Sequence, residues 1–231
     1  MDETPLLLDM PMKRAMEVKG GKNVSYFNTG NECKRISVVL WCSEHGQKMS
    51  PMLVIKEHRR LEQGTCAKGI PVCKQKNSYM TGELCIKWFE SVFLYGLREL
   101  QMSLPHQLLI LDTFSGYLSS NFKQRTKAEN IPIAVIPGGL TKECQPLDIG
   151  INRSFKAQFR KLWTRWVERL DLPSTKSGKI KTIEIDDLAH LVRDAWKDVP
   201  AECIINSFKS AHLSLQKGSI CNRSNYTFNE T

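Results

Sequence analysis

The distribution of apolar and polar residues predicts strands in the first quarter of the chain. The runs RISVVLWC (residues 35–42) and MSPMLVIK (49–56) are apolar and rich in β-branched residues, and the polar segment between them contains a glycine suited to a turn. They therefore predict two antiparallel strands. KNVSYFN (22–28) alternates between polar and apolar residues and predicts a further strand.

The following segments predict helices and a second group of strands. From about residue 82 to 100, apolar residues recur every three or four positions, which predicts a helix. QLLILD (107–112) and IPIAVIP (131–137) are unbroken apolar runs separated by a polar segment. They predict a strand, a helix and a strand, with both strands buried on both faces of a parallel sheet. Helical patterns recur at 183–197 and 200–210.

These elements together predict an α/β fold in which a mixed sheet is flanked by helices. A polar stretch, LPSTKSGKIKT, begins at residue 172, and the last residues of the chain show no periodic pattern. We therefore expect one domain over residues 1–171, a helical extension of the same domain over 172–210, and a frayed tail over 211–231.

Composition narrows the class of protein without fixing its function. Hydrophobic residues make up 41% of the 231 positions, which suits a soluble globular core. Thirty-three Lys and Arg against 24 Asp and Glu give a formal net charge of +9, which favours phosphate-rich partners. No apolar run approaches the length of a membrane span, so no membrane partner is expected. The eight cysteines form no C-x-x-C pair, so we expect reduced thiols and no structural zinc.

Two aspartates follow the two apolar runs that predict parallel strands. Asp112 closes LLILD, and Asp148 follows IPIAVIP after a turn. Because the carboxyl ends of neighbouring parallel strands line one crevice, these carboxylates can converge there, with Asp2 as a third candidate. Carboxylates that meet in one pocket need a cation between them, and oxygen ligands suit Mg²⁺ or Mn²⁺. Taken alone, Asp148 is better explained as an acidic residue that favours the N-terminal end of a helix.

Three segments resemble the catalytic blocks of a known family. MDETP, LLILDTFSGYL and VIPGGLTKECQPLDIGINRSFK are similar, in this order, to the three blocks of pogo/Tigger-type transposases. The catalytic domain of that family is a DDE superfamily endonuclease with a ribonuclease-H-like fold. The resemblance extends from residue 2 to about 210, and thirty-five residues separate Asp112 from Asp148, a spacing typical of such enzymes.

The resemblance implies a metal site and a nucleic-acid partner. Asp2, Asp112 and Asp148 stand where the family has its catalytic, metal-binding carboxylates, which hold Mg²⁺ or Mn²⁺ for phosphodiester hydrolysis and strand transfer. The expected partner is DNA and the expected location is the nucleus. A homodimer is an open alternative, because transposition normally needs paired subunits.

The segment after Asp148 predicts a basic amphipathic helix over about residues 151–170. Its apolar stripe should pack on the sheet: Phe155, Phe159, Leu162, Trp166 and Leu170. The basic residues beside the stripe either form a solvated helix face or contact the DNA backbone next to the metal site. The candidates for backbone contacts are Arg153, Lys156, Arg160 and Lys161.

Two departures from the family pattern predict that catalysis is impaired or lost. Relatives usually have a histidine five residues after the second aspartate, where this chain has Tyr117, a neutral phenol that cannot carry protons as imidazole does. Asp2 directly follows Met1, so we expect the first, central strand to be largely missing, along with the helix-turn-helix region that precedes this domain in the family. Whether the chain is an enzyme therefore stays open. The alternatives are a non-catalytic domesticated nuclear DNA-binding or interaction protein, and a non-functional transposon remnant.

Overall fold

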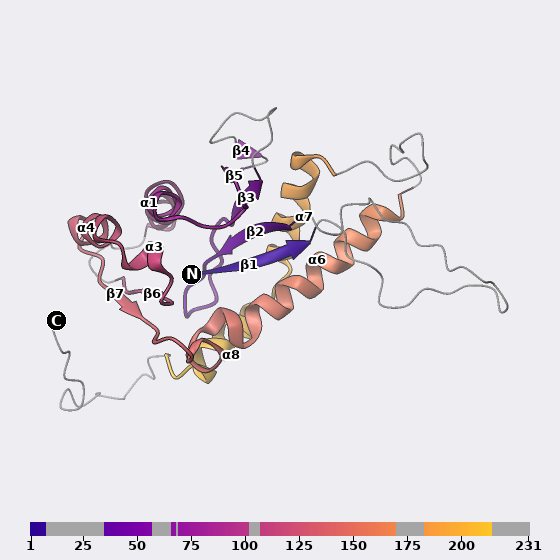
Figure 1. Ribbon diagram of the computed structural model, residues 1–231. Coiled ribbons are helices and arrows are strands. Elements are labelled where there is room, and N and C mark those ends of the chain that lie inside the picture. The colour runs from indigo at the N-terminus through magenta and orange to yellow at the C-terminus, as the bar shows by residue number, and fades with distance from the viewer. Residues whose placement is uncertain (8–34, 57–65, 68, 102–106, 170–182, 214–231) are drawn as a thin grey trace.

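The structure, a computed structural model, describes residues 1–7, 35–56, 66–67, 69–101, 107–169 and 183–213 (Figure 1). Its larger sheet has five strands in the order β1-β2-β3-β5-β4. β1, β2 and β3 pair in antiparallel fashion, β3 and β5 are parallel, and β4 is antiparallel to β5, so the sheet is mixed, as predicted. The strands are β1 (Asp2–Leu7), β2 (Arg35–Leu40), β3 (Met52–Lys56), β4 (Cys66–Ala67) and β5 (Ile70–Gln75).

A second, two-stranded sheet holds β6 (Leu109–Leu111) and β7 (Ile133–Val135), which are parallel as predicted. The helices between them are α3 (Ser115–Leu118) and α4 (Ser120–Ala128). The prediction that both strands are buried on both faces is wrong for β7, because Val135 is 37% exposed. Ile133 and Ala134 of β7 are also only partly buried, so the packed elements do not cover both faces of this strand.

The helices cover the two faces of the larger sheet (Figure 1). The predicted helix over 82–100 is present and contains a π-helical stretch, η1, in its middle. The predicted helices at 183–197 and 200–210 correspond to α7 and α8. The bounds are α1 (Gly82–Trp88), η1 (Phe89–Phe93), α2 (Leu94–Glu99), α5 (Thr141–Cys144), η3 (Leu147–Ile151), α6 (Asn152–Val167), α7 (Ile185–Lys197) and α8 (Ala201–Ser210).

The core lies in two clusters, one on each face of the larger sheet. Side chains alternate along β2, so Val38 and Leu40 pack with α6, α7 and α8, whereas Val39 packs with α1, η1 and α2. This double burial explains why β2 and β3 are apolar at nearly every position. The apolar stripe of α6 faces the first cluster, with Phe155, Phe159 and Trp166 buried as predicted and Leu162 partly buried.

β1 differs from the expectation that most of the first strand is missing. Residues 2–7 form a six-residue strand, with Asp2 opposite Leu40 and Leu7 opposite Arg35. Thr4 and Leu6 are buried and alternate with exposed residues, as in a strand with one covered face. At the start of β1, the backbone nitrogen of Met1 donates to the carbonyl oxygen of Ile110, 3.2 Å away, which links the two sheets.

Some predictions concern residues that the structure does not describe or an element that the pattern missed. The predicted strand at 22–28, the polar stretch at 172–182 and Leu170 lie outside the described residues. β5 was not predicted, because Pro71 and the polar residues at its end interrupt the apolar run. In the described part of the chain, no helix is both long and apolar enough to cross a membrane.

Candidate functional site

Asp2 and Asp148 lie together, joined by the side chain of Asn152. The Nδ2 atom of Asn152 donates to Oδ2 of Asp2 at 2.6 Å and to Oδ1 of Asp148 at 3.2 Å. Asp2 is the first residue of β1, Asp148 lies in η3, and Asn152 begins α6. Residues four apart on a helix are neighbours on its surface, so Asp148 and Asn152 present one combined face to the start of β1. The expected convergence of Asp2 and Asp148 is therefore present.

The electrostatics of this pair favour a positive partner. The pKa of Asp2 is raised to about 6, first by burial and then by the charge of Asp148, while the hydrogen bond from Asn152 and the charge of the Met1 amino group act in the opposite direction. The Oδ1 atom of Asn152 is buried and has no hydrogen-bond partner among the described residues. Because Nδ2 faces both carboxylates, Oδ1 points away from them, and the oxygen ligands that face each other are those of Asp2 and Asp148, a ligand type that hard cations use.

Asp112 is placed differently from the other two predicted carboxylates. It directly follows β6, and its Oδ1 accepts a hydrogen bond from the backbone N–H of Phe114 at 3.1 Å. In the described ranges, no three His, Cys, Asp or Glu side chains are grouped closely enough to hold a metal ion. The structure thus joins two of the three predicted carboxylates, and a site made of all three stays a prediction.

Glu3 is a residue near the site that sequence reasoning missed. The hydroxyl of Tyr117 donates to Oε1 of Glu3 at 3.1 Å and also contacts the sulfur of Met1 at 3.0 Å. The pKa of Glu3 is raised to about 7, mainly by burial; the hydrogen bond from Tyr117 opposes this shift, and the charges of Asp2 and Asp112 add to it. The alternation of β1 placed Asp2 and Glu3 on opposite faces, and the sequence alone could have shown that much.

Tyr117 occupies the position at which relatives usually have a histidine. Its side chain is 2% exposed, and burial followed by the charge of Glu3 raises its pKa well above its usual range. The phenol therefore stays protonated near neutral pH and acts as a hydrogen-bond donor. This agrees with the prediction that Tyr117 does not replace histidine as a proton carrier.

Basic side chains of α6 line a pocket together with the carboxylate site. The pocket has a volume of about 450 Å³. Arg153, Lys156 and Arg160 lie three and four residues apart and so share one helix face. Lys161 is exposed but does not line this pocket. The lining residues are Glu3, Thr4, Pro5, Asp148, Asn152, Arg153, Lys156, Ala157 and Arg160.

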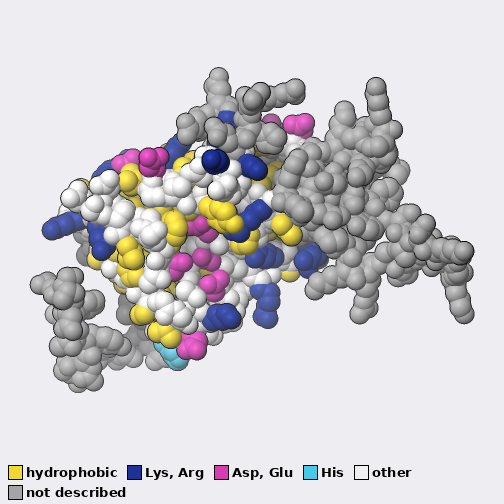
Figure 2. All heavy atoms as spheres, viewed as in Figure 1, with side chains coloured by type: hydrophobic (Ala, Val, Ile, Leu, Met, Phe, Trp, Pro, Cys, Tyr) yellow, Lys and Arg dark blue, Asp and Glu magenta, His cyan; other side chains and the backbone are white. Residues whose placement is uncertain are grey.

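The pocket has an acidic part, formed by Glu3 and Asp148, and an adjoining basic part, formed by the Lys and Arg side chains of α6. In Figure 2, acidic side chains gather near the middle of the face shown, and Lys and Arg side chains lie beside them along the position of α6. Lys156 belongs to both parts: burial lowers its pKa, whereas attraction to Asp2 and Asp148 raises it. Helix α6 carries five Lys or Arg residues and no Asp or Glu, so its exposed side is strongly positive.

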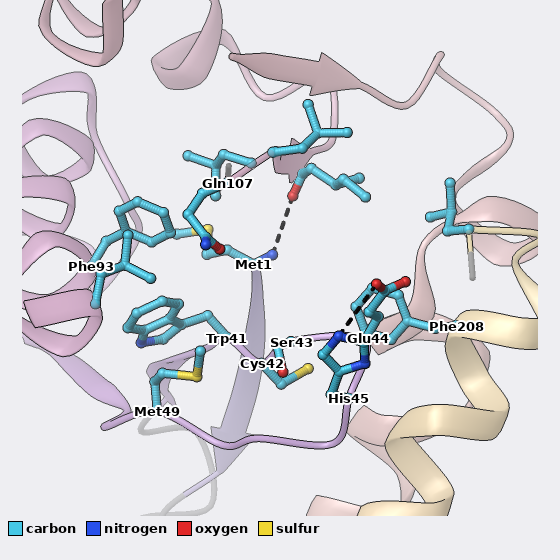
Figure 3. Close-up of a pocket in the computed structure, with 15 residues that line it drawn as sticks. Met1, Trp41, Cys42, Ser43, Glu44, His45, Met49, Phe93, Gln107 and Phe208 are labelled. Carbon is cyan, nitrogen blue, oxygen red and sulfur yellow. Dashed lines mark hydrogen bonds and ion pairs between the residues drawn. The ribbon is translucent and has the colours of Figure 1, made fainter. Parts of the chain in front are cut away.

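A second pocket, of about 390 Å³, lies beside Met1 and is mainly apolar (Figure 3). Cys42 and His45 both line it, which raises the question of a nucleophilic cysteine. Burial raises the pKa of the Cys42 thiol to about 11, and Nε2 of His45 is 3.7 Å from Oε1 of Glu44. A thiol that stays protonated is a poor nucleophile, so this pocket lacks the chemistry found in the first.

Comparisons with known proteins identify the family and the fold. A family profile described as "DDE superfamily endonuclease" matches residues 33–208. The chain is 26% identical over 215 residues to the human protein "Pogo transposable element with KRAB domain", and 25% identical to the mouse protein of the same name. These matches cover 92% of this chain but 34% and 35% of the relatives, so the chain spans about a third of their length.

Solved structures support the fold independently of sequence. The Mos1 mariner paired-end complex with Mn matches with a TM-score of 0.57 and 9% identity, over 91% of this chain and 51% of the other. The Mos1 transposase paired-end complex with the left transposon end matches with a TM-score of 0.56 and 8% identity, over 91% of this chain and 50% of the other. At such low identity the likeness concerns the fold, which is ribonuclease-H-like, as predicted.

Proposed function

Because the chain belongs to the DDE superfamily endonuclease family, we propose that it is a transposase-derived domain that binds the DNA backbone in the nucleus beside a divalent-cation site. One observation carries the proposal: Asp148, Asn152 and the basic side chains of α6 line a single pocket. Acidic and basic groups of one pocket can bind the same phosphodiester. The carboxylates would hold a cation, and the guanidinium or ammonium groups would contact the phosphate oxygens.

DNA binding would be independent of base sequence. Arg153 and Arg160 are exposed, and Lys156 lies between them in sequence and is partly buried near the carboxylates. Such side chains displace counterions from the DNA backbone, so affinity should fall steeply with salt concentration. Lys161 would contribute less, because it does not line the pocket.

The residues present fit a divalent cation. Asp2 and Asp148, which the amide of Asn152 bridges, are oxygen donors of the kind that Mg²⁺ and Mn²⁺ prefer. In the proposed site Asp112 is a further carboxylate. When bound, such ions activate water or a 3′-hydroxyl and stabilise the leaving oxygen of a phosphodiester. The solved Mos1 structure that this fold resembles is a complex with Mn.

We expect catalysis to be weak or lost. Tyr117 is a buried neutral phenol bonded to Glu3, so it cannot pass protons to or from a reacting group near neutral pH. This observation favours the second candidate function, a non-catalytic nuclear DNA-binding protein. A homodimer stays a prediction, which sedimentation equilibrium would test.

The DNA-binding proposal is tested by fluorescence anisotropy with a labelled duplex of arbitrary sequence in EDTA. The triple variant R153Q/K156Q/R160Q should bind more weakly, and the slope of log affinity against log salt should fall by about 0.9 for each lost phosphate contact. A matched control, K123Q/K127Q/K142Q, removes the same charge from exposed positions on α4 and α5. Equal loss in both variants would show that net charge, and not α6, is responsible.

The enzyme question is tested separately with supercoiled plasmid and Mn²⁺. We expect little or no nicking by the wild-type protein. If the wild-type protein nicks the plasmid and D112A does not, the protein is an active nuclease and Asp112 is required for cleavage. Equal nicking by wild type and D112A would point to a contaminating nuclease and would leave the non-catalytic reading in place.

A further inference from the structure

Tyr79 is an exposed aromatic side chain on an anchored stretch of backbone. It is 49% exposed, whereas its chain neighbours Ser78 and Met80 are both buried. Ser78 closes the turn after β5 with a positive φ of 57°, which is uncommon for a residue other than glycine. Thr81 then caps α1 by accepting a hydrogen bond from the backbone N–H of Leu84. The ring of Tyr79 is therefore held outside the core by a backbone that is fixed on both sides.

The guanidinium group of Arg35 lies over one face of this ring. Its Cζ atom is 4.3 Å from the ring centroid, and its Nη1 atom donates to the hydroxyl oxygen of Tyr79 at 3.2 Å. A cation is attracted to the electron-rich face of an aromatic ring, so this contact fixes the orientation of the ring. Because Arg35 covers one face, the solvent-exposed part of the ring lies on its other face and its edges. That surface is suited to a planar partner.

This stacked pair adjoins the pocket between β1 and α6. The backbone N–H of Met80 donates to the carboxyl group of Glu3, which lines that pocket. Arg35 lies opposite the last residue of β1. The pKa of Lys156, another residue of the pocket, is lowered by burial and to a smaller extent by the charge of Arg35. In Figure 2, hydrophobic and basic side chains border the acidic group on the face shown. The pair thus lies at the rim of the pocket.

From this arrangement we infer that Tyr79, backed by Arg35, is a stacking platform for an unpaired base of single-stranded DNA whose phosphates lie on α6. The inference rests on the proposed DNA binding and deepens it, because it names the form of DNA that the site accepts. An aromatic ring beside a positively charged groove is the combination with which proteins bind single strands of any sequence. In a duplex the bases are paired and stacked on each other, so only an unpaired or flipped base can stack on a ring of the protein surface.

The charges around Tyr79 favour a nucleic acid over an apolar protein segment. Helix α6 carries five Lys or Arg residues and no Asp or Glu, and Arg35 adds a cation at the ring itself. An apolar segment would leave these cations without counter-charges. A single strand of DNA instead brings one phosphate with every base, so the same ligand can satisfy the ring and the basic helix face.

The test is fluorescence anisotropy of the full chain in EDTA, with a labelled single-stranded oligothymidylate and, in parallel, a labelled blunt duplex. Y79A should weaken binding of the single strand by about 5-fold to 150-fold, the range expected for the loss of one stacked base, and should leave binding of the duplex unchanged. Y79F should keep the wild-type affinity for both, because stacking uses the ring and not the hydroxyl.

Tyr95 on α2 offers a matched control. It is 58% exposed, and its hydroxyl also bonds a neighbouring side chain, that of Glu99 at 2.6 Å. Y95A therefore removes an equally exposed ring and a comparable hydrogen bond. It should bind the single strand and the duplex as the wild-type protein does.

Photochemical cross-linking identifies the contact directly. An oligonucleotide in which 5-iodouracil replaces thymine should couple under ultraviolet light to the peptide that contains Tyr79, because coupling needs a base and an aromatic ring in contact. Mass spectrometry of the digested complex locates the cross-link. Coupling at this peptide should persist in Y79F and disappear in Y79A. A cross-link confined to other peptides would contradict the inference.

Three affinity results would also overturn the inference. One is wild-type affinity of Y79A for the single strand, the second is a loss in Y79A that is equal for single strand and duplex, and the third is a loss in Y79F or Y95A as large as that in Y79A. The proposed DNA binding is judged by the duplex, for which R153Q/K156Q/R160Q loses affinity and Y79A does not. If the duplex result holds and Y79A binds the single strand normally, the inference fails alone; if the wild-type protein binds neither DNA, both fail.

Discussion

Asp2 and Glu3 are neighbours on β1, yet their side chains lie on opposite faces of the sheet and have different surroundings. Asp2 meets the amide of Asn152 and the charge of Lys156, beside the pocket on α6. Glu3 meets the buried phenol of Tyr117. The difference shows how the alternation of a strand gives adjacent carboxylates different surroundings: Asp2 lies close to a second carboxylate, and Glu3 is held by a neutral hydrogen-bond donor.

The largest expected loss of stability comes from removing apolar side chains of the two core clusters, one on each face of the larger sheet. Phe159 on α6 and Phe122 on α4 are both fully buried, so F159A and F122A should each lower the free energy of unfolding by about 3 to 5 kcal/mol. Urea denaturation measures this loss. Only F159A should also weaken DNA binding, because α6 carries the basic residues. Equal DNA affinity in the two folded variants would contradict the division between the sides.

A smaller effect is expected from the phenol that holds Glu3. Y117F removes the donor to Oε1 of Glu3, which leaves a buried carboxyl group without that partner and should cost about 1 to 3 kcal/mol. The loss should be larger at pH 8 than at pH 5, because an ionised carboxylate depends more on a donor. Thermal unfolding at both pH values checks this, and a loss independent of pH would show that Tyr117 acts by packing alone.

The stability of the protein should also depend on pH through Glu3. Its pKa rises from 4.5 to about 7 on folding, so the folded protein binds this proton more tightly than the unfolded chain does. The contribution is therefore greatest below pH 4.5 and is lost as the pH rises to about 7. Burial is the main cause of this shift; the hydrogen bond from Tyr117 opposes it, and the charges of Asp2 and Asp112 add to it.

Denaturation across pH 4 to 8 in EDTA measures this dependence. E3Q should flatten the decline, although a slope should persist because the pKa of Asp2 is raised in the same direction. E143Q, at an exposed glutamate on α5, serves as the control. A decline that is as steep in E3Q as in wild type would assign the proton to another group.

The smallest effect distinguishes two lysines of α6. K156Q should reduce DNA affinity in EDTA by several-fold, whereas K161Q should reduce it less, because Lys161 does not line the pocket. Anisotropy at low salt resolves this difference. Equal losses of affinity would show that the DNA contact extends beyond the pocket and includes Lys161, as the sequence predicted.

Much of the fold could be predicted because its signals are local. The hairpin of β2 and β3 and the helix over 82–100 follow from runs that are buried along their length. β1 was not predicted at its full length, because Pro5 interrupts the apolar run, although Thr4 and Leu6 are buried and alternate with Pro5 and Leu7. The exposure of β7 depends on which elements pack against it, which no local pattern records.

The site was predicted in part for a similar reason. Asp2 and Asp148 were found from their blocks, and the asparagine four residues after Asp148 could have been recognised as its neighbour on a helix. The bond between Glu3 and Tyr117 joins residues 114 positions apart and has no signature in the sequence. Asp112 was expected beside the other two, but its place depends on how the two sheets meet.

The most direct test of the central claim, that cation and DNA backbone share one site, is DNA affinity with and without Mn²⁺. If the carboxylates and the basic face of α6 act on the same phosphates, Mn²⁺ should tighten binding by wild type and leave binding by D2N/D148N unchanged. Anisotropy titrations of both proteins at fixed ionic strength provide the comparison. An equal effect of Mn²⁺ on both proteins would contradict the claim.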